Sequence, residues 1–584
     1  MNYFKVVSEI IRSEVQNLID EGTLVSDLNL GQVGLETTRD PAHGDLASNA
    51  AMVLAKSART NPKELGELIV DRLVKRPEFE FVSLAGPGFI NLKMVPQFWT
   101  QLLPAVLGSG LKYGDCDLGR AQTINVEYVS ANPTGPMHIG HARGAVIGDA
   151  LGNLLSKAGY EVTREYYVND AGAQIDVLAR SVHLRYLQAL GEKIDKIPDG
   201  LYPGEYLKQT AKDLVERDGS KWRELTEEVW LPELRNFAIG SMMSLIRDDL
   251  TALGVIHDVF TAESGLVSNG SNSEVVSELK SLDLVYIGTL KPPKGKILEE
   301  WEKRPQLLFR STKFGDDVDR PLQKADGEWT YFASDIAYHL NKFERGFNSM
   351  VNVWGADHKG YVKRMKAAVK AITKNKGTLN VQLCNLVSLL EGGRPAKMSK
   401  RAGSFVSLRQ VVDEVGKDAV RFMMLTRNSD APLDFDLKKV LEQSKDNPLF
   451  YVQYAHARIC SVIRNAAVSF PDLLLDDSSL SKADMRELND PGELKMIREL
   501  ASWPEVVERA AKLREPHKIT FYLSDLAASF HAFWNRGNSD ESLRFIVLDD
   551  SQKTIKRVAL ARAVGIVIGS GLAVIGVEPL EEMR

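Results

Sequence analysis

Residues 124–141 constrain the fold more than any other segment of the chain. A hydrophobic run at 124–129 is followed by turn-forming residues and then by His138-Ile139-Gly140-His141, after which a helical pattern begins at Ala142. This order predicts a strand, a turn and a helix start. Because unpaired N–H groups and the helix dipole favour negative charge at a helix start, we predict a phosphate-binding corner. A turn whose histidines merely cap the helix is the alternative for this segment alone.

The composition is that of a globular protein with several domains. The chain has 584 residues, of which 44% are hydrophobic and 26% charged, enough for three or four cores of ordinary size. The net charge of -5 does not indicate a nucleic-acid-binding protein, so contacts with RNA must come from local basic patches. Cys116, Cys384 and Cys460 are far apart and form no CxxC pair, which is typical of the reducing cytosol. We expect a cytoplasmic protein.

No segment is expected to enter a membrane. Residues 1–20 place apolar side chains at helical spacing with charges between them, which predicts an amphipathic helix on a soluble domain. The apolar run 563–577 is shorter than the roughly 20 residues that span a bilayer, and it contains four glycines. We interpret it as a buried terminal helix.

Changes in hydrophobic pattern predict an α/β multidomain protein with three regions. Residues 1–111 read as a small α+β domain. Residues 112–445 alternate strand and helix signals, which predict a Rossmann-type parallel sheet, with a helical insertion at about 175–253. Residues 446–584 read as an all-α bundle.

A basic segment, 392–403, follows the strand-like run 381–390. It concentrates Lys397, Lys400 and Arg401 on a loop with glycines at both ends. Alone, such a loop is usually just solvated. Paired with the upstream corner, it can close over a triphosphate and neutralise the charge on a departing pyrophosphate. The pair predicts adenylyl transfer from ATP.

The two segments resemble the paired signatures of class I aminoacyl-tRNA synthetases, as Met137 to His141 and Lys397 to Lys400. The chain is most similar to the arginyl-tRNA synthetase family, over essentially its whole length. Segments typical of that family occur at 43–49, 86–92, 168–172, 354–361, 418–422 and 576–579. Val420 stands where the family more often has leucine, a conservative change.

The resemblance implies an ATP-dependent ligase that makes arginyl-adenylate from L-arginine and then charges tRNA(Arg). It implies Mg²⁺ beside ATP, no metal site built from protein residues, and a monomer. It also implies an N-terminal domain at the outer corner of the tRNA, a catalytic domain and an anticodon-binding domain. Members of the family often need bound tRNA before they activate the amino acid, and we adopt that as a hypothesis.

The same resemblance assigns catalysis to His138 and His141, at the α-phosphate, and to Lys397 and Lys400, at the pyrophosphate. The residues expected at ATP are Pro133, Gly135, Met137, His138, Gly140, His141, Gly355, Asp357, Val387, Lys397, Met398, Ser399 and Lys400.

A guanidinium group is planar and permanently charged, so a site that selects it needs carboxylates that accept its forked donors. By similarity, Asp335 and Glu263 are the best candidates, although a surface ion pair is the alternative for Glu263. Whether Asp357 and His358 contact ribose or amino acid stays open. The residues expected at arginine are Glu127, Ser130, Asn132, His138, Glu263, Tyr331, Asp335 and Asp357.

Basic side chains recur in the first region, among them Arg39 and Lys56, and aromatic and basic residues alternate in the third, notably at Tyr451, Tyr454 and Arg458. RNA is bound through phosphate contacts and by stacking on unpaired bases. We expect these five residues to contact tRNA. Solvated surface charge and aromatic core packing are the alternatives.

Three other functions share part of this pattern. A small-molecule nucleotidyltransferase uses a similar histidine segment but needs neither the distant lysine loop nor a terminal helical domain. A synthetase for another amino acid should lack paired acids suited to guanidinium. An inactive RNA-binding relative should have eroded signatures, and both are intact here.

Overall fold

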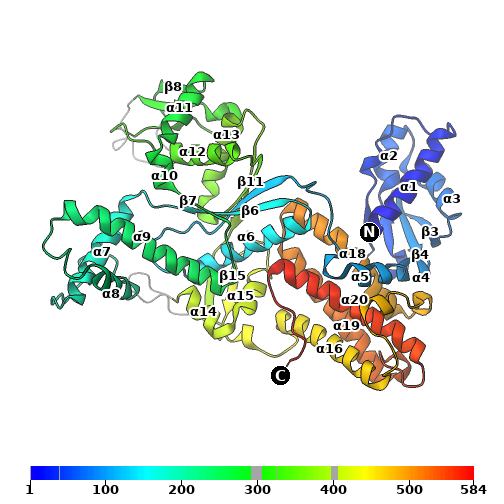
Figure 1. Ribbon diagram of the computed structural model, residues 1–584. Helices are drawn as coiled ribbons and strands as arrows, with labels where there is room; N and C mark the ends of the chain where they lie inside the picture. Colours follow the sequence, from blue (N-terminus) through cyan, green and yellow to red (C-terminus); the bar gives the residue numbers. More distant parts are fainter. Residues whose placement is uncertain (1, 39, 291–304, 325, 396–405, 584) are drawn as a thin grey trace.

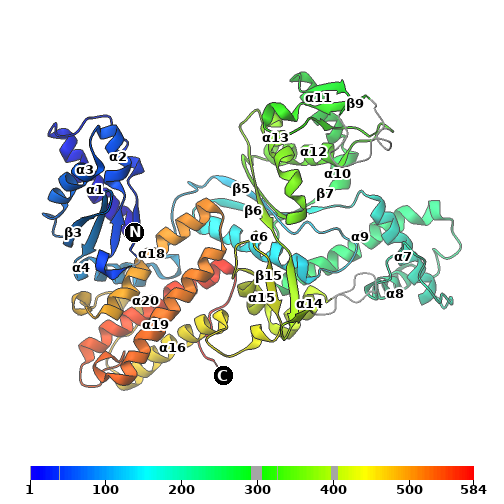
Figure 2. The same ribbon diagram turned by 180° about the vertical axis from the view of Figure 1, so that it is seen from behind.

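The structure is a computed structural model that describes residues 2–38, 40–290, 305–324, 326–395 and 406–583. Figure 1 shows a central parallel sheet, with the helical insertion on one side and the C-terminal bundle on the other, and Figure 2 shows the same arrangement from behind. The N-terminal unit stands on the C-terminal helices.

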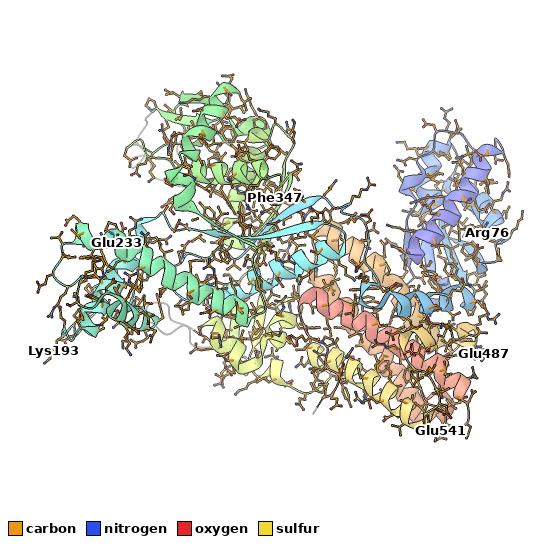
Figure 3. The ribbon with its side chains drawn as sticks, in the orientation of Figure 1. Arg76, Lys193, Glu233, Phe347, Glu487 and Glu541 are labelled. Carbon is orange, nitrogen blue, oxygen red and sulfur yellow. The ribbon has the colours of Figure 1, made fainter. Side chains whose placement is uncertain are left out.

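The N-terminal unit is an antiparallel sheet covered by helices. Its sheet has the order β1-β2-β4-β3, and the apolar face of its first helix is buried, as the periodicity predicts. Arg76, labelled in Figure 3, pairs with Glu78 at 2.9 Å on this unit. The elements are α1 (Tyr3–Asp20), β1 (Leu35–Thr37), β2 (Leu46–Ser48), α2 (Ala50–Ala58), α3 (Pro62–Leu73), β3 (Phe79–Ala85), β4 (Phe89–Met94), α4 (Pro96–Thr100) and α5 (Leu102–Ser109).

The central sheet confirms the predicted Rossmann-type topology. All neighbouring strands in the order β12-β11-β5-β6-β7 run parallel. Chain order reverses between β5 and β11, and ligands bind beyond the carboxyl ends of strands at such a point. The elements are β5 (Thr123–Glu127), α6 (Ile139–Lys157), β6 (Glu161–Val168), β7 (Val259–Ala262), β11 (Ser349–Gly355) and β12 (Thr378–Cys384).

Two insertions interrupt the sheet. The helical one, between β6 and β7, is the one that the sequence predicts, and Lys193 and Glu233 in Figure 3 mark it. A second lobe separates β7 from β11 and contains a small antiparallel sheet, β10-β9-β8. The elements are α7 (Ala173–Ala189), α8 (Tyr206–Asp218), α9 (Glu227–Ala252), α10 (Glu263–Ser268), α11 (Ser271–Ser281), β8 (Val285–Gly288), β9 (Gln306–Phe309), β10 (Arg320–Pro321) and α12 (Tyr331–Glu344). Helix α13 (Val362–Ile372) lies between β11 and β12.

The strand-like run 381–390 forms parts of two strands in the structure. The chain turns after Cys384, so this run is divided between β12 of the central sheet and β13, which pairs with β15 in another sheet. Asn385 forms the turn, since its side chain bonds the backbone of Leu386 and Asp430. The elements here are β13 (Val387–Glu391), β14 (Arg394–Pro395), α14 (Leu408–Val415), α15 (Lys417–Met424) and β15 (Leu433–Asp436).

The C-terminal region is all helical, as predicted. Among the described residues one helix, α20, is long and apolar enough to cross a membrane, but 89% of its apolar window is buried inside the protein, which is typical of a core helix. Glu487 and Glu541 in Figure 3 lie near the outer end of this bundle. The helices are α16 (Pro448–Ser469), α17 (Asp477–Leu480), α18 (Pro491–Leu513), α19 (His517–Ser539) and α20 (Ser551–Ile575).

A buried arginine joins three of these parts. Arg421, on α15, is fully buried and pairs with Asp149 of α6. It also donates to the carbonyl groups of Leu253, just after α9, at 3.1 Å and of Ile575, at the end of α20, at 2.8 Å. The first helix of the central sheet is thereby tied to both the helical insertion and the C-terminal bundle.

Candidate active site

The loop that follows β5 has a strained backbone. Val129 and Ser130 have φ angles of 69° and 41°, a region that is especially unfavourable for a β-branched residue. The Ser130 hydroxyl donates to Glu127 Oε1 at 3.2 Å and accepts the N–H of Tyr167 at 3.1 Å. These contacts hold the strained turn and place Ser130 and Glu127 together at the carboxyl end of the sheet.

Two histidines form the first turn of α6. Gly140 N–H donates to His138 Nδ1 at 3.1 Å, and His138 N–H donates to His141 Nδ1 at 3.3 Å, which makes a reciprocal cap. A Cβ on Gly140 would lie 2.8 Å from the His138 ring, so only glycine leaves room for this arrangement. The helix start presents two imidazoles with the positive end of its dipole behind them.

A cavity of about 390 Å³, which we call the histidine cavity, lies in front of this helix start. One wall comes from the helical insertion, where the Tyr206 hydroxyl donates to the carbonyl of Thr134 at 2.7 Å. The lining residues are Asn132, Thr134, Gly135, Pro136, His138, His141, Tyr202, Pro203, Gly204 and Tyr206.

A second cavity of about 450 Å³, the acidic cavity, lies beyond the ends of β5, β6 and β11. Asn132 lines both cavities, so they meet at this residue. Among the described residues, three carboxylates and no lysine or arginine line the acidic cavity. The lining residues are Glu127, Val129, Ser130, Asn132, Tyr167, Asn169, Glu263, Tyr331, Asp335, Tyr338, His339, Asn352, Val353, Trp354, Gly355, His358 and Tyr361.

Burial raises the pKa of two of these carboxylates. The pKa of Asp335 is raised to about 7, first by burial and then by the charges of Glu127 and Glu263, although the Tyr361 hydroxyl donates to it. Burial, with a smaller contribution from Asp170, also raises the pKa of Glu263. Carboxylates without enough positive charge around them are suited to a cationic ligand.

Three family models together match nearly the whole chain. They are the arginyl tRNA synthetase N-terminal domain over residues 5–94, the class I (R) tRNA synthetase catalytic domain over 102–458 and the DALR anticodon-binding domain over 452–583. The chain belongs to the arginyl-tRNA synthetase family.

Individual members of this family agree with that assignment. An arginine–tRNA ligase from Parvibaculum lavamentivorans is 54% identical over the full length of both chains. A Campylobacter jejuni crystal structure described as an arginyl-tRNA synthetase is 33% identical, with a TM-score of 0.71, and covers 84% of this chain and 100% of its own. The Thermus thermophilus arginyl-tRNA synthetase, 20% identical, has the same fold, with a TM-score of 0.74 over 99% of this chain and 100% of its own.

The structure brings most residues expected at arginine to one place. Glu127, Ser130, Asn132, Glu263, Tyr331 and Asp335 all line the acidic cavity, although they come from three separate segments. His138 lines the histidine cavity instead. The Asp357 side chain lines neither cavity; it is 80% exposed and lies 3.5 Å from His358.

The residues expected at ATP are more dispersed. Gly135, His138 and His141 line the histidine cavity, and Gly355 lines the acidic cavity. The Met137 side chain is buried, with its N–H bonded to Asp249, and Val387 is buried on β13. Pro133, Met137, Gly140 and Val387 are absent from the described lining of both cavities. Lys397, Met398, Ser399 and Lys400 lie outside the described residues.

None of the described residues expected at tRNA lines either cavity. Arg39 lies outside the described residues, and Lys56 is exposed on α2. Tyr451, Tyr454 and Arg458 are half-buried on α16; the guanidinium of Arg458 lies 4.0 Å from the centre of the Tyr454 ring and donates to its hydroxyl at 2.8 Å. They form one aromatic and cationic cluster with part of its surface exposed.

Sequence reasoning missed several residues of the site. Tyr338 and His339 follow Asp335 on α12 at the spacing of one helix face, a signal that could have found them. Nothing local pointed to Tyr202 and Tyr206, because they reach the histidine cavity from the helical insertion. The other missed residues are Val129, Tyr167, Asn169, Asn352, Val353, Trp354 and Tyr361 in the acidic cavity and Thr134, Pro136, Pro203 and Gly204 in the histidine cavity.

Proposed function

We propose that the chain attaches L-arginine to tRNA(Arg) in two steps that use ATP. The observation that carries this proposal is the junction of the two cavities at Asn132. One cavity is acidic and fits a cationic side chain, and the other lies at a helix start that suits phosphate. An amino acid in the first can therefore meet a nucleotide in the second.

The acidic cavity fixes the orientation of the amino acid in this proposal. Its guanidinium pairs with Asp335 and Glu263, which can accept forked donors in a confined space. Glu127 and Ser130 hold the α-ammonium group at the opposite end. The carboxylate then points toward Asn132 and His138, where the cavities meet.

Activation follows from this placement. The arginine carboxylate attacks the α-phosphorus of ATP, the phosphorus–oxygen bond to pyrophosphate breaks, and His138 and His141 stabilise the charge on the phosphate oxygens. Lys397 and Lys400 hold the leaving pyrophosphate. Mg²⁺ enters on the ATP phosphates, since such ions are bound mainly through substrate phosphates; among the described residues no cluster of His, Cys, Asp or Glu forms a metal site.

Transfer uses the same site. The 2′-OH of the terminal adenosine attacks the carbonyl carbon of arginyl-adenylate, and AMP leaves. No protein nucleophile is required, so the rate enhancement comes from positioning and electrostatic stabilisation.

We also propose that the chain is a cytoplasmic monomer without a membrane contact.

In this proposal each of the three regions has its own role in binding or charging tRNA. Residues 1–111, with Arg39 and Lys56, contact its outer corner, residues 112–445 carry out the chemistry, and residues 446–584, with Tyr451, Tyr454 and Arg458, bind the anticodon. The match of separate family models to the two terminal regions supports this division.

Charging of total tRNA with each amino acid in turn tests the proposal. We expect stable incorporation of arginine alone. Incorporation of another amino acid would indicate a different synthetase, and none at all would indicate a nucleotidyltransferase or an inactive relative. ATP–pyrophosphate exchange with and without tRNA tests whether activation needs the bound RNA, and robust exchange without tRNA would contradict that hypothesis.

A further inference from the structure

A row of polar residues crosses the central sheet beside the acidic cavity. Glu127 on β5 lies directly beside Asn352 on β11 and beside Glu165 on β6. The side chains of Glu127 and Glu165 are almost fully buried. Neighbouring strands are only about 4.8 Å apart, so two carboxylates in one row repel each other unless cations accompany them.

Helix α12 and the residue that follows it supply one cation for each carboxylate. Lys342 Nζ, on the helix, lies 2.6 Å from Glu127 Oε2, and Arg345, directly after the helix ends, lies 2.8 Å from Glu165. Lys342 is fully buried and does not line the acidic cavity. It therefore acts on a ligand only through the groups that it touches.

The two ion pairs differ in how many hydrogen bonds the carboxylate oxygens already accept. Both oxygens of Glu165 accept from Arg345, and Asn125 and Thr261 donate to them as well. In the part of the chain that the structure describes, Lys342 donates to Oε2 of Glu127, and Oε1 accepts only from the hydroxyl of Ser130. Because a carboxylate oxygen can accept more than one hydrogen bond, Oε1 can take another donor from the cavity that Glu127 lines.

Neighbouring groups fix the position of Lys342. Its ammonium group lies 4.4 Å from the centre of the Tyr338 ring and donates to Asn352 Oδ1 at 3.3 Å. The amide of Asn352 in turn lies 3.0 Å from His339 Nε2. Burial, and then the charge of Lys342, lower the pKa of His339 to about 3, so the ring is neutral. Its Nδ1 lies 2.8 Å from the carbonyl oxygen of Asp335 and donates to it. Nε2 therefore accepts from the Asn352 amide, which keeps the Asn352 oxygen toward the lysine.

We propose that Lys342 is a positioning residue for amino-acid binding. By holding Oε2 of Glu127 it directs Oε1 toward Ser130 and the cavity, where Oε1 accepts a hydrogen bond from the α-ammonium group of the substrate. This inference rests on the proposed function, since it takes the ligand to be an amino acid with a guanidinium side chain. Lys342 thereby makes the site selective for an α-amino group as well as for the guanidinium.

The test compares L-arginine with 5-guanidinopentanoic acid, which lacks only the α-amino group. The dissociation constant of each compound is measured by calorimetry on the full chain. Because both compounds carry the guanidinium group, a change in how that group is bound affects both constants alike and leaves their ratio unchanged. We expect the wild type to prefer arginine by about 10- to 100-fold, the range of one lost charge-assisted hydrogen bond. Lys342→Met should lose most of this preference.

A double-mutant cycle separates positioning from a general structural role. Lys342→Met, Glu127→Gln and the double variant should show the same reduced preference, because the two residues act as one unit. The matched control Arg345→Met removes the neighbouring cation and should retain the wild-type preference. If Lys342→Met does not fold, Lys342→Gln, which is polar but has no positive charge and a shorter side chain, takes its place in the cycle.

The outcomes are distinct. A folded Lys342 variant with the wild-type preference, or losses that add in the double variant, would overturn the inference. A wild type that binds both compounds equally would overturn it too, while the proposed function stands. A wild type that binds neither compound would refute the proposed function and the inference with it.

Discussion

The imidazole rings of His138 and His141 stack at the first turn of α6 with their centres 3.8 Å apart. We predict that His141→Ala lowers the rate of ATP–pyrophosphate exchange about 10²- to 10³-fold, the usual effect of removing one group that stabilises developing charge. The loss of its cap should cost only about 1 kcal/mol of stability. Near-normal exchange in a folded variant would remove His141 from the mechanism, and the same comparison applies to Lys400→Ala.

Asp335 should make arginine binding depend on pH. Its pKa is raised to about 7, and only the ionised carboxylate pairs with a guanidinium. We predict that the affinity for L-arginine rises with pH up to about 7 and levels off above it, as measured by calorimetry. Asp335→Asn should bind arginine more weakly and show no such rise; an unchanged pH profile in this variant would assign the titration to another group.

The same residue has an opposite effect on folding. Because its folded-state pKa lies above its unfolded value, the unfolded chain binds fewer protons between about pH 4 and 7. The contribution of Asp335 to stability therefore falls as pH rises through this window. We predict that Asp335→Asn raises the thermal midpoint more at pH 8 than at pH 5, and an equal shift at both values would contradict the prediction.

Two glycines of α6 should respond oppositely to alanine. A Cβ on Gly148 would lie 2.1 Å from the ring of Tyr128, whereas a Cβ on Gly144 meets no atom within 4 Å. We predict that Gly148→Ala costs about 1–3 kcal/mol through overpacking and that Gly144→Ala stabilises by roughly 0.5–1 kcal/mol. Thermal unfolding of both variants checks this. Exchange activity should fall only in Gly148→Ala, since Tyr128 precedes the strained turn at Val129.

Tyr454 should contribute to tRNA affinity through its ring. Stacking on a base is worth about 1–3 kcal/mol, so we predict that Tyr454→Ala raises the KM for tRNA about 5- to 100-fold in charging assays. The control Tyr454→Phe keeps the ring and loses only the bond from Arg458, so its KM should stay close to that of the wild type. An unchanged KM in Tyr454→Ala would mean that the ring serves packing alone.

The hydrophobic pattern along the sequence predicted those parts of the fold that are determined by residues close together in the chain. The strand β5, its turn and α6 follow one another in sequence, and alternating strand and helix signals were enough for the parallel sheet. The division of 381–390 between two sheets was not predictable in this way. It depends on a turn at Asn385 that is held by residues far along the chain.

The candidate site was predictable where a motif or a resemblance named residues, and six of those expected at arginine line one cavity. Their roles there stay predictions. Lys342 escaped notice because its partner, Glu127, is 215 positions away. Helical periodicity places Lys342 on a buried face with Tyr338, but it gives no indication of which strand that face covers.

Arg421 has a consequence for how such proteins can be recombined. Its guanidinium binds Asp149 at one side and the last carbonyl group of α20 at another, and a Cβ on Gly576 would overlap it. A bundle exchanged from another synthetase must therefore bring a compatible helix end as well as its RNA-binding surface. Without that end, the graft leaves a buried guanidinium with a missing acceptor beneath the helix that begins at the two histidines.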